Sequence, residues 1–318
     1  MRTICIVIPV YNEEENLPVL HERLVKALSD VKDLDYRILL VDDHSSDATP
    51  EVIRKLAAGD PRVETIRLSR NSGSHVACVA GIDHGDADML MIMAADLQDP
   101  PELIPEMVRR HAEGWQIVWA VREQREGESF FTLAASQVFY WLMNRISDVK
   151  FAPKGADFLL ADRRVVKAFR QMPERNISVF AAFAWLGFKQ VSVPYVKKSR
   201  HAGVSKWSVA KKIKLAIDSF VGFSYLPLRF ISVLGVCSAT AGLLWAMEVL
   251  VSRLLGFTWT SGFASIMMAI LIMGGLQLVM LGVLGEYLWR VLEESRRRPR
   301  YFVENAFSAH EHPGSERK

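Results

Sequence analysis

The stretch that decides the fold is residues 89–102, MLMIMAADLQDPPE. It begins as an apolar run and stops at Asp96, where Gln98, Asp99 and a Pro-Pro pair follow. An apolar run of this length that ends at a turn signal predicts a buried strand of a parallel sheet. Because α/β sheets bind ligands at the carboxyl ends of their strands, we expect Asp96 to lie at a ligand site.

Two roles remain open for Asp96. The two carboxylates of Asp96 and Asp99 and the amide oxygen of Gln98 are hard donors that suit Mg²⁺ or Mn²⁺ bridging to a substrate phosphate, which favours a metal site in this turn. The alternative is a structural role, in which Asp96 caps the helix expected near Pro100.

Outward from this strand, short β-rich runs alternate with helical stretches between Thr3 and Val196. This alternation predicts right-handed βαβ units and an α/β domain with a mostly parallel sheet. The expected strands are residues 4–8, 36–41, 62–68, 89–93, 117–121, 158–161 and 189–194. The expected helices are residues 14–29, 48–58, 75–84, 102–113, 130–146, 164–171 and 179–186.

Two long apolar stretches follow, residues 230–252 and 262–286, and each is long enough to cross a ~30 Å hydrocarbon core. Two adjacent segments of this length are hard to bury in a soluble protein, so we expect a transmembrane hairpin over residues 227–290. Before it, residues 208–226 place apolar side chains on one helical face and lysines on the other. That pattern predicts a juxtamembrane helix in the membrane interface, with an ordinary surface helix as the alternative.

The basic residues predict the orientation of the hairpin. Lysines and arginines gather before the first span and after the second, whereas only Arg253 flanks the connecting loop. By the positive-inside rule, both termini and the globular domain, residues 1–207, are expected in the cytoplasm. The basic tail, residues 291–318, is expected to be partly disordered, with the disorder after Val303. The N-terminus lacks the length and cleavage site of a signal peptide.

Composition and strand ends disfavour several classes of protein. A net charge of +3 gives no support for nucleic-acid binding. Cys5, Cys78 and Cys237 lack metal-site spacing and are interpreted as packing residues. The first strand ends in PVYNEE, an acidic and bulky turn where a dinucleotide-binding dehydrogenase would carry GxGxxG.

Two further strand ends carry polar clusters. In DDHSSD, residues 42–47, an Asp at the strand end can accept a hydrogen bond from a base N–H or a ribose hydroxyl. Ser46 or Asp47 is a credible N-cap for the next helix. In SRNSGS, residues 69–74, the turn before a helix is a candidate site where backbone N–H groups meet an anion.

The ordered set of motifs resembles a known family. PVYNEEENL, VDDHSSDAT, RNSGSHVACVAG, ADLQDPPELI and GADFLLADRRVV are similar, in order and spacing, to those of the family 2 glycosyltransferases of the GT-A fold. RHAGVSKWS, the hairpin and GEYLWR…RRRPRYFV narrow the resemblance to the polyprenyl-phosphate glycosyltransferases, the group that contains dolichol-phosphate mannose synthases and bacterial undecaprenyl-phosphate sugar transferases. The resemblance covers Thr3 to Val303.

The resemblance implies inverting transfer of a sugar from a nucleotide-sugar, with UDP-glucose as the first candidate, to undecaprenyl phosphate at the bacterial inner membrane, and a homotetramer. It implies nucleotide-sugar binding by Pro9, Tyr11, Glu13, Asp42, Asn71 and Asp96, metal binding by Asp96 and Gln98, phosphate binding by Arg122, Arg200 and Lys206, and catalysis by Asp157. A phosphate monoester with a second pKa of ~6 is mostly dianionic near neutrality, so Asp157 is either a base or a group that positions the acceptor. A structural role beside a helix is its third reading.

Three departures from the family pattern remove charge. Ala94 stands where the family has the first Asp of Asp-Ala-Asp, Leu159 stands where it has Arg, and residues 131–133 lack its basic side chains. Asp99 or water is the expected substitute for the lost carboxylate. The alternative function is a non-catalytic nucleotide-sugar-binding membrane subunit with an assembly or regulatory role.

Overall fold

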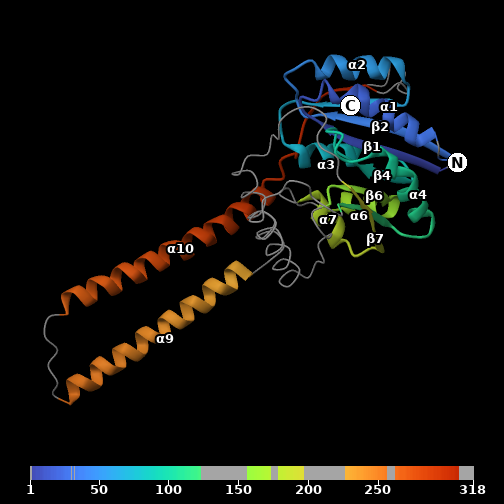
Figure 1. The fold of residues 1–318 in the computed structure, drawn as a ribbon. Coiled ribbons are helices and arrows are strands. Elements are labelled where there is room, and N and C mark those ends of the chain that lie inside the picture. The colour runs from blue at the N-terminus through green and yellow to red at the C-terminus, as the bar shows by residue number, and fades with distance from the viewer. Residues whose placement is uncertain are drawn as a thin grey trace. The chain divides into compact units, whose positions relative to one another are not determined.

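The structure, a computed structural model, describes residues 2–29, 31, 33–122, 156–172, 178–196, 226–255 and 262–307. The chain divides into two compact units (Figure 1). The first combines Met1–Ser219 with Pro299–Lys318, and the second is Phe220–Arg298. The C-terminal segment therefore belongs to the globular unit.

The first unit is built on an eight-stranded sheet in the order β7-β5-β6-β4-β1-β2-β3-β8. β6 and β8 run antiparallel to their neighbours, and the other pairs are parallel. This confirms the predicted α/β architecture with a mostly parallel sheet. The strands are β1 (Arg2–Val10), β2 (Leu34–Asp42), β3 (Val63–Leu68), β4 (Met89–Ile92), β5 (Ile117–Arg122), β6 (Phe158–Asp162), β7 (Gln190–Tyr195) and β8 (Val303–Phe307).

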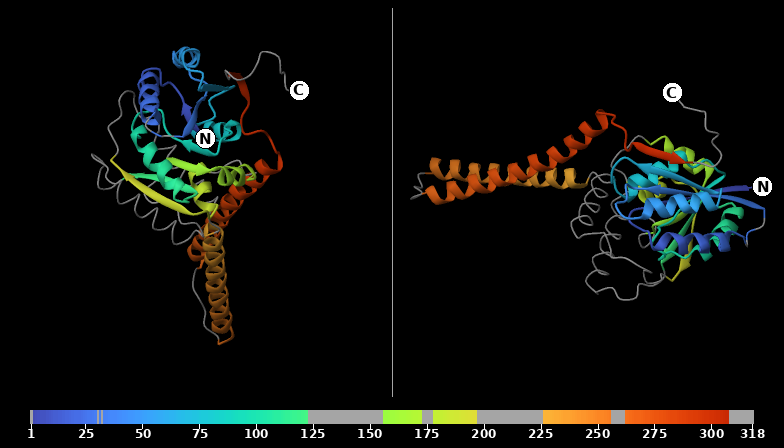
Figure 2. Two further views of the ribbon diagram at one scale, coloured as in Figure 1. Left: turned by 90° about the vertical axis from the view of Figure 1, so that its right-hand side faces the viewer. Right: turned by 90° about the horizontal axis from the view of Figure 1, so that it is seen from above.

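Helices pack in two groups, one on each face of the sheet (Figures 1 and 2). The first group is α1 (Asn16–Ser29), α2 (Thr49–Gly59) and α4 (Ile104–Ala112), which follows the short η1 (Pro101–Leu103). The second is α3 (Ser74–His84), α6 (Arg163–Arg170) and α7 (Val179–Trp185). Both faces of the central strands are therefore covered, which explains why the residues of β4 are all buried.

The contact between α3 and β1 is unusually close. A Cβ built on Gly81 would lie 2.1 Å from Cγ1 of Val7, so only glycine fits at this position. Cys78 on α3 and Cys5 on β1 are buried, which confirms them as packing residues, and burial raises the pKa of both thiols to about 12. Cys237, by contrast, is exposed on its helix.

The expectation of disorder after Val303 is wrong for the rest of β8. Residues 303–307 pair antiparallel with β3, where Ile66 lies opposite Ala306. Without this pairing β3 would leave a row of unpaired backbone groups at the sheet edge. The side chains of β8 are all exposed, so no apolar alternation marks the strand in the sequence.

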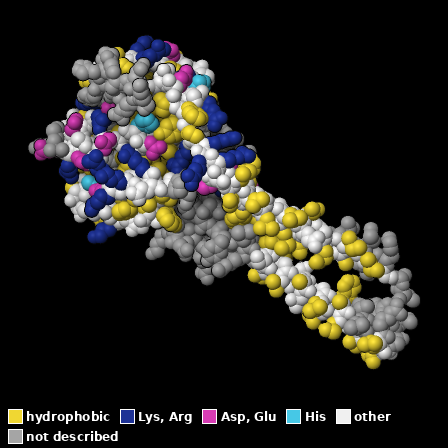
Figure 3. Space-filling view, turned by 180° about the vertical axis from the view of Figure 1, so that it is seen from behind, with side chains coloured by type: hydrophobic (Ala, Val, Ile, Leu, Met, Phe, Trp, Pro, Cys, Tyr) yellow, Lys and Arg dark blue, Asp and Glu magenta, His cyan; other side chains and the backbone are white. Residues whose placement is uncertain are grey.

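The second unit is an antiparallel helical hairpin of α9 (Leu226–Leu254) and α10 (Phe263–Ser295). The helices meet where Gly235 lies close to Met280 and the Ser238 hydroxyl lies 3.1 Å from the sulfur of Met273. Figure 3 shows hydrophobic side chains along the described parts of the hairpin.

Two stretches of the hairpin, Ile231–Glu248 and Met268–Ser295, are long and apolar enough to cross a membrane, with mean hydropathies of 1.5 and 2.2. This confirms the two predicted apolar helices, although α10 continues to Ser295, into residues expected to begin the tail. The helices expected over residues 130–146 and 208–226 lie outside the described residues.

Candidate active site

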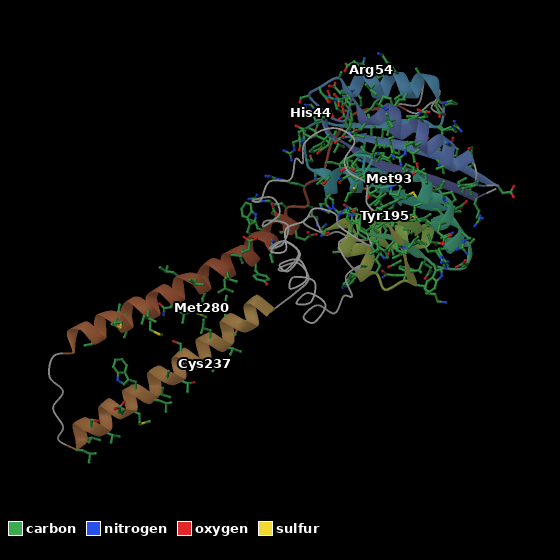
Figure 4. The ribbon with its side chains drawn as sticks, in the orientation of Figure 1. His44, Arg54, Met93, Tyr195, Cys237 and Met280 are labelled. Atoms are coloured by element: carbon green, nitrogen blue, oxygen red, sulfur yellow. The ribbon has the colours of Figure 1, made fainter. Side chains whose placement is uncertain are left out.

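Strand direction gathers the predicted site residues at one edge of the sheet. The parallel strands β1, β2, β4, β5 and β7 all end at this edge. Because β6 is antiparallel to β4 and β5, Asp157, which precedes β6, lies at the same edge. Figure 4 marks this region by Met93, just after β4, and Tyr195, the last residue of β7.

Arg122 and Asp157 form an ion pair at this edge. Nη2 of Arg122 lies 2.5 and 2.6 Å from the two carboxylate oxygens of Asp157. The Arg122 side chain is 11% exposed and that of Asp157 is 44% exposed. Burial disfavours the guanidinium charge, but the charge of Asp157, the contact with Tyr195 and the charge of Asp99 together outweigh it, so the pKa of Arg122 is raised and the side chain stays charged.

Tyr195 joins this pair to Asp99. The Tyr195 hydroxyl donates to Oδ1 of Asp99 and accepts from Nε of Arg122 at 3.3 Å. Burial raises the pKa of Tyr195, and the nearby Asp99 charge raises it further, so the hydroxyl remains a donor. Tyr195 was not among the predicted site residues, and its position directly after a predicted strand was the available signal.

Asp99 is therefore an unsuitable replacement for the carboxylate missing at Ala94. Asp99 is 1% exposed, and one of its oxygens accepts from Tyr195. The expectation that Asp99 substitutes at a metal site conflicts with this contact.

Asp96 and Gln98 lie in the turn after β4, and both are half-buried. Oδ1 of Asp96 accepts the backbone N–H of Gln98 at 3.2 Å. The following η1 has Pro100 at its N-cap and no side-chain cap, so the interpretation of Asp96 as a helix cap is wrong.

A metal ion at this turn would need ligands from a bound substrate in addition to those from the protein. Within the described ranges, no group of three or more His, Cys, Asp or Glu side chains is placed to hold an ion. Mg²⁺ usually keeps several waters and takes one or two carboxylates plus substrate phosphates. The carboxylate of Asp96 and the amide oxygen of Gln98 fit that minimal donor set.

Asp42, at the end of β2, is buried and already engaged. Its Oδ1 accepts the N–H of Ser45 at 2.8 Å, and its Oδ2 pairs with Nη1 of Arg67. Arg67 also donates to the Ser45 carbonyl at 3.3 Å and to Glu304, on β8, at 3.0 Å. Neither Arg67 nor Glu304 was among the predicted site residues, because their partners are far away in the sequence.

The loop after β1 is tied to the loop after β2. The N–H of Glu13 donates to Oγ1 of Thr49 at 2.8 Å, and the N–H of Asn12 donates to Oγ of Ser45 at 3.0 Å. Pro9 and Tyr11, in the same stretch, are half-buried. The predicted nucleotide-binding residues of the two loops thus share one rim of the sheet.

The backbone N–H groups in the turn before α3 already donate to a carboxylate of the protein itself. The two carboxylate oxygens of Asp43 accept the N–H groups of Ser72 and Gly73 at 2.7 and 2.8 Å. The expectation that these backbone groups meet a bound anion is therefore wrong. Asn71 is exposed in the same turn.

His75, in the first turn of α3, is a second group that the sequence did not single out. Its Nδ1 is buried and has no hydrogen-bond partner among the described residues. Its ring packs edge-on against that of Phe180, with 5.8 Å between the ring centroids. Burial lowers the pKa of His75, and the charge of Asp157 opposes this. A neutral imidazole therefore lies in the electrostatic range of Asp157.

The remaining predicted residues differ in what the structure says of them. Leu159 is fully buried within β6, so that departure from the family lies in the core. Arg200, Lys206 and residues 131–133 lie outside the described residues.

Comparison with known proteins identifies the family. The sequence model described as Glycosyl transferase family 2 matches residues 5–169. The chain belongs to this family. The N-terminal unit is thus a glycosyltransferase catalytic domain of the GT-A class, followed in sequence by two apolar helices.

Several relatives match this glycosyltransferase over nearly its whole length. The uncharacterized glycosyltransferase YkcC of Bacillus subtilis (strain 168) is 37% identical, over 95% of this chain and 93% of the relative. The uncharacterized glycosyltransferase sll0501 of Synechocystis sp. is 39% identical, over 94% of each chain. The bactoprenol glucosyl transferase of Shigella phage SfV is 35% identical, over 95% of this chain and 98% of the relative.

Proposed function

We propose that this glycosyltransferase transfers a sugar, with inversion, from a nucleotide-sugar to a polyprenyl phosphate at the cytoplasmic face of the bacterial inner membrane. Undecaprenyl phosphate is the proposed acceptor and UDP-glucose the first candidate donor. The observation that carries the proposal is the Arg122–Asp157 pair at the ligand-binding edge of the sheet. The bactoprenol glucosyl transferase of phage SfV supports the acceptor class, because the match includes the hairpin.

The reaction breaks one bond and forms one. An oxygen of the acceptor phosphate attacks the anomeric carbon, and the bond to the nucleoside diphosphate breaks with its electron pair leaving on the diphosphate. A phosphate monoester with a second pKa of ~6 is already mostly dianionic near neutrality, so no strong base is required.

The ion pair fits a role in positioning charge. Asp157 and Tyr195 fix two edges of the Arg122 guanidinium. Its Nη1 has no hydrogen-bond partner among the described residues and is thus the edge proposed to meet a phosphate oxygen. A preorganised cation of this kind stabilises charge that develops on the leaving group. Arg200 and Lys206 are proposed to add to this charge.

Asp96 and Gln98 would hold the proposed Mg²⁺ or Mn²⁺. A bound divalent ion would offset the negative charge of the diphosphate. Pro9, Tyr11, Glu13, Asp42 and Asn71 are proposed to hold the nucleotide.

A lipid acceptor explains why the enzyme carries two apolar helices. Each CH₂ of an isoprenoid tail stabilises its place in the bilayer by about 0.8 kcal/mol, so the enzyme must meet the headgroup at the membrane surface. We infer a hairpin that spans the membrane, with both termini cytoplasmic, and a homotetramer as the assembly. Blue-native electrophoresis at four times the chain mass supports the tetramer, and a monomeric band counts against it.

A donor screen tests the proposed function. Purified protein is incubated with undecaprenyl phosphate, Mg²⁺ or Mn²⁺, and UDP-glucose, UDP-galactose or UDP-linked amino sugars, and the lipid fraction is analysed by mass spectrometry. We expect a polyprenyl-phosphate hexose that requires the divalent ion and is reduced by about 100-fold or more in Asp157→Asn. Donor binding without any lipid product, with activity gained in Ala94→Asp, would favour the non-catalytic alternative.

A further inference from the structure

We propose that β8, the strand that follows the second apolar helix, is part of the donor-binding site, because Glu304 positions Arg67, which in turn holds Asp42. The inference rests on the proposed function, in which Asp42 binds the nucleotide. Glu304 and Arg67 are therefore positioning residues for donor binding.

Strand register brings the three residues together. Asp42 lies opposite Arg67 across the β2–β3 pair, and Arg67 lies opposite Asn305 across the β3–β8 pair. Glu304, next to Asn305, is separated from Arg67 by 237 positions in the sequence. Side chains from three adjacent strands thus meet at the carboxyl edge of the sheet.

The guanidinium of Arg67 is held on three edges. Its Nε donates to Oε2 of Glu304 at 3.0 Å, its Nη1 pairs with Asp42, and its Nη2 donates to the Ser45 carbonyl at 3.3 Å. The side chains of Arg67 and Asp42 are 24% and 4% exposed, so the contact between these two is largely shielded from water, whereas the side chain of Glu304 is 44% exposed. Charge-assisted contacts in such a place fix geometry more firmly than exposed pairs do.

Glu304 also determines how the positive charge of Arg67 is shared between its acidic neighbours. With Glu304 present, one arginine is shared between two carboxylates. Without it, the freed Nε edge of Arg67 turns toward Asp42 and occupies more of the carboxylate that would accept from the nucleotide. We expect that change to weaken donor binding.

A second contact and a cavity also place β8 close to Asp42. Nδ1 of His44, a residue with φ of 61° that follows Asp42 by two positions and is labelled in Figure 4, lies 3.6 Å from Oε2 of Glu304. A cavity of about 790 Å³ is lined by Asp42 and Arg67 on one side and by Asn305, Ala306 and Phe307 of β8 on another. The chain that leaves the apolar hairpin thus forms one wall of the cavity that Asp42 lines.

Isosteric variants of the full-length protein in detergent test the inference. Glu304→Gln removes the carboxylate that pairs with Arg67 and keeps the shape of the side chain. Asp86→Asn is the matched control, because Asp86 is 70% exposed and pairs with Arg163 at 2.9 Å, on the loop that leads into β4. Calorimetry with UDP and with GDP gives nucleotide affinity, and initial rates give the kinetic constants.

We expect Glu304→Gln to raise the Kd for the nucleotide and the KM for the donor by about fivefold or more, the usual size of a coupling between sites. The kcat, the KM for undecaprenyl phosphate and the melting temperature should stay close to those of Asp86→Asn and the wild type. Glu304→Asp should recover part of the affinity. Combined with Asp42→Asn, the loss from Glu304→Gln should largely disappear, because both act through Arg67.

Each contrary outcome has a separate meaning. If Glu304→Gln binds the nucleotide as the wild type does, or loses no more than Asp86→Asn, the positioning role is overturned and the proposed function stands. If the wild type binds neither nucleotide and makes no lipid product, the proposed function fails and the inference fails with it.

Discussion

The Arg122–Asp157 pair shows how a residue's role depends on its partner. The resemblance to the family implies phosphate binding for Arg122 and catalysis for Asp157, as two separate roles. In the structure the two form an ion pair, and Tyr195 extends it to Asp99. Such contacts between strand ends depend on the order of strands in the sheet, which the alternation of β-rich and helical runs leaves undetermined.

A double-mutant cycle tests whether Arg122 and Asp157 act as a unit. We expect Asp157→Asn and Arg122→Gln each to lower kcat by about 100-fold or more, because each leaves the other charge unpaired at the site. The double variant should be little worse than the poorer single variant. Initial rates of lipid-product formation give the values, with Arg109→Gln on the exposed face of α4 as control. Multiplying losses would show that the two residues act independently.

Asp60 lies at the opposite edge of the sheet and makes the stability of the fold depend on pH. Side-chain hydrogen bonds from Arg62 lower the pKa of Asp60 to about 2, against the opposing effect of burial. A folded-state pKa below the unfolded value near ~3.9 contributes stability above that value, and the contribution is lost as pH falls through about 2. Asp60 contributes about 2 kcal/mol in this way at neutral pH.

Asp60→Asn should therefore melt about 5 °C below the wild type at pH 7, and the two melting temperatures should converge as the pH falls toward 2. Glu22→Gln on the exposed face of α1 is the control. Thermal unfolding in detergent measures both. A gap that stays constant from pH 7 to pH 3 and below would rule out the titration of Asp60 as its cause.

At the scale of elements, the sequence predicts the elements of the sheet well. The strand from 89–93 is observed as Met89–Ile92, and that from 158–161 as Phe158–Asp162, because apolar runs bounded by polar turns carry a strong signal. β8 was missed because its five residues are exposed and take their strand conformation from backbone pairing with β3. Pairing with a strand more than 200 positions away leaves no local pattern.

Gly81 tests the packing of α3 on β1. Gly81→Ala would put a methyl group 2.1 Å from Cγ1 of Val7, so the helix or the strand must shift. Overpacking of this kind costs about 1–3 kcal/mol, which predicts a melting temperature lower by several degrees. Val7→Ala in the same background should restore part of the loss.

Gly59, at the end of α2, is the matched control. A Cβ there meets nothing within 4 Å, so Gly59→Ala should leave stability unchanged or raise it slightly. Equal melting temperatures for the two alanine variants would contradict the close contact between α3 and β1.

At the scale of the whole molecule, the chain combines a family 2 glycosyltransferase domain with two helices apolar enough to span a membrane. The composition of the hairpin was enough to predict these helices, and the ordered motifs were enough to predict the fold of the domain. The division into units was only partly predictable, because the C-terminal segment joins the first unit through β8 and the contacts of Tyr301 and Arg300 with residues 83 and 172.

Oriented membrane vesicles test the central claim, that a cytoplasmic nucleotide-sugar site feeds a lipid phosphate in the bilayer. Vesicles that carry the protein and undecaprenyl phosphate are given labelled UDP-glucose from outside. Inside-out vesicles should form a labelled lipid-linked sugar directly, whereas right-side-out vesicles should do so only after permeabilisation. Labelled lipid in sealed right-side-out vesicles, or none in either orientation with any of the screened donors, would contradict the account.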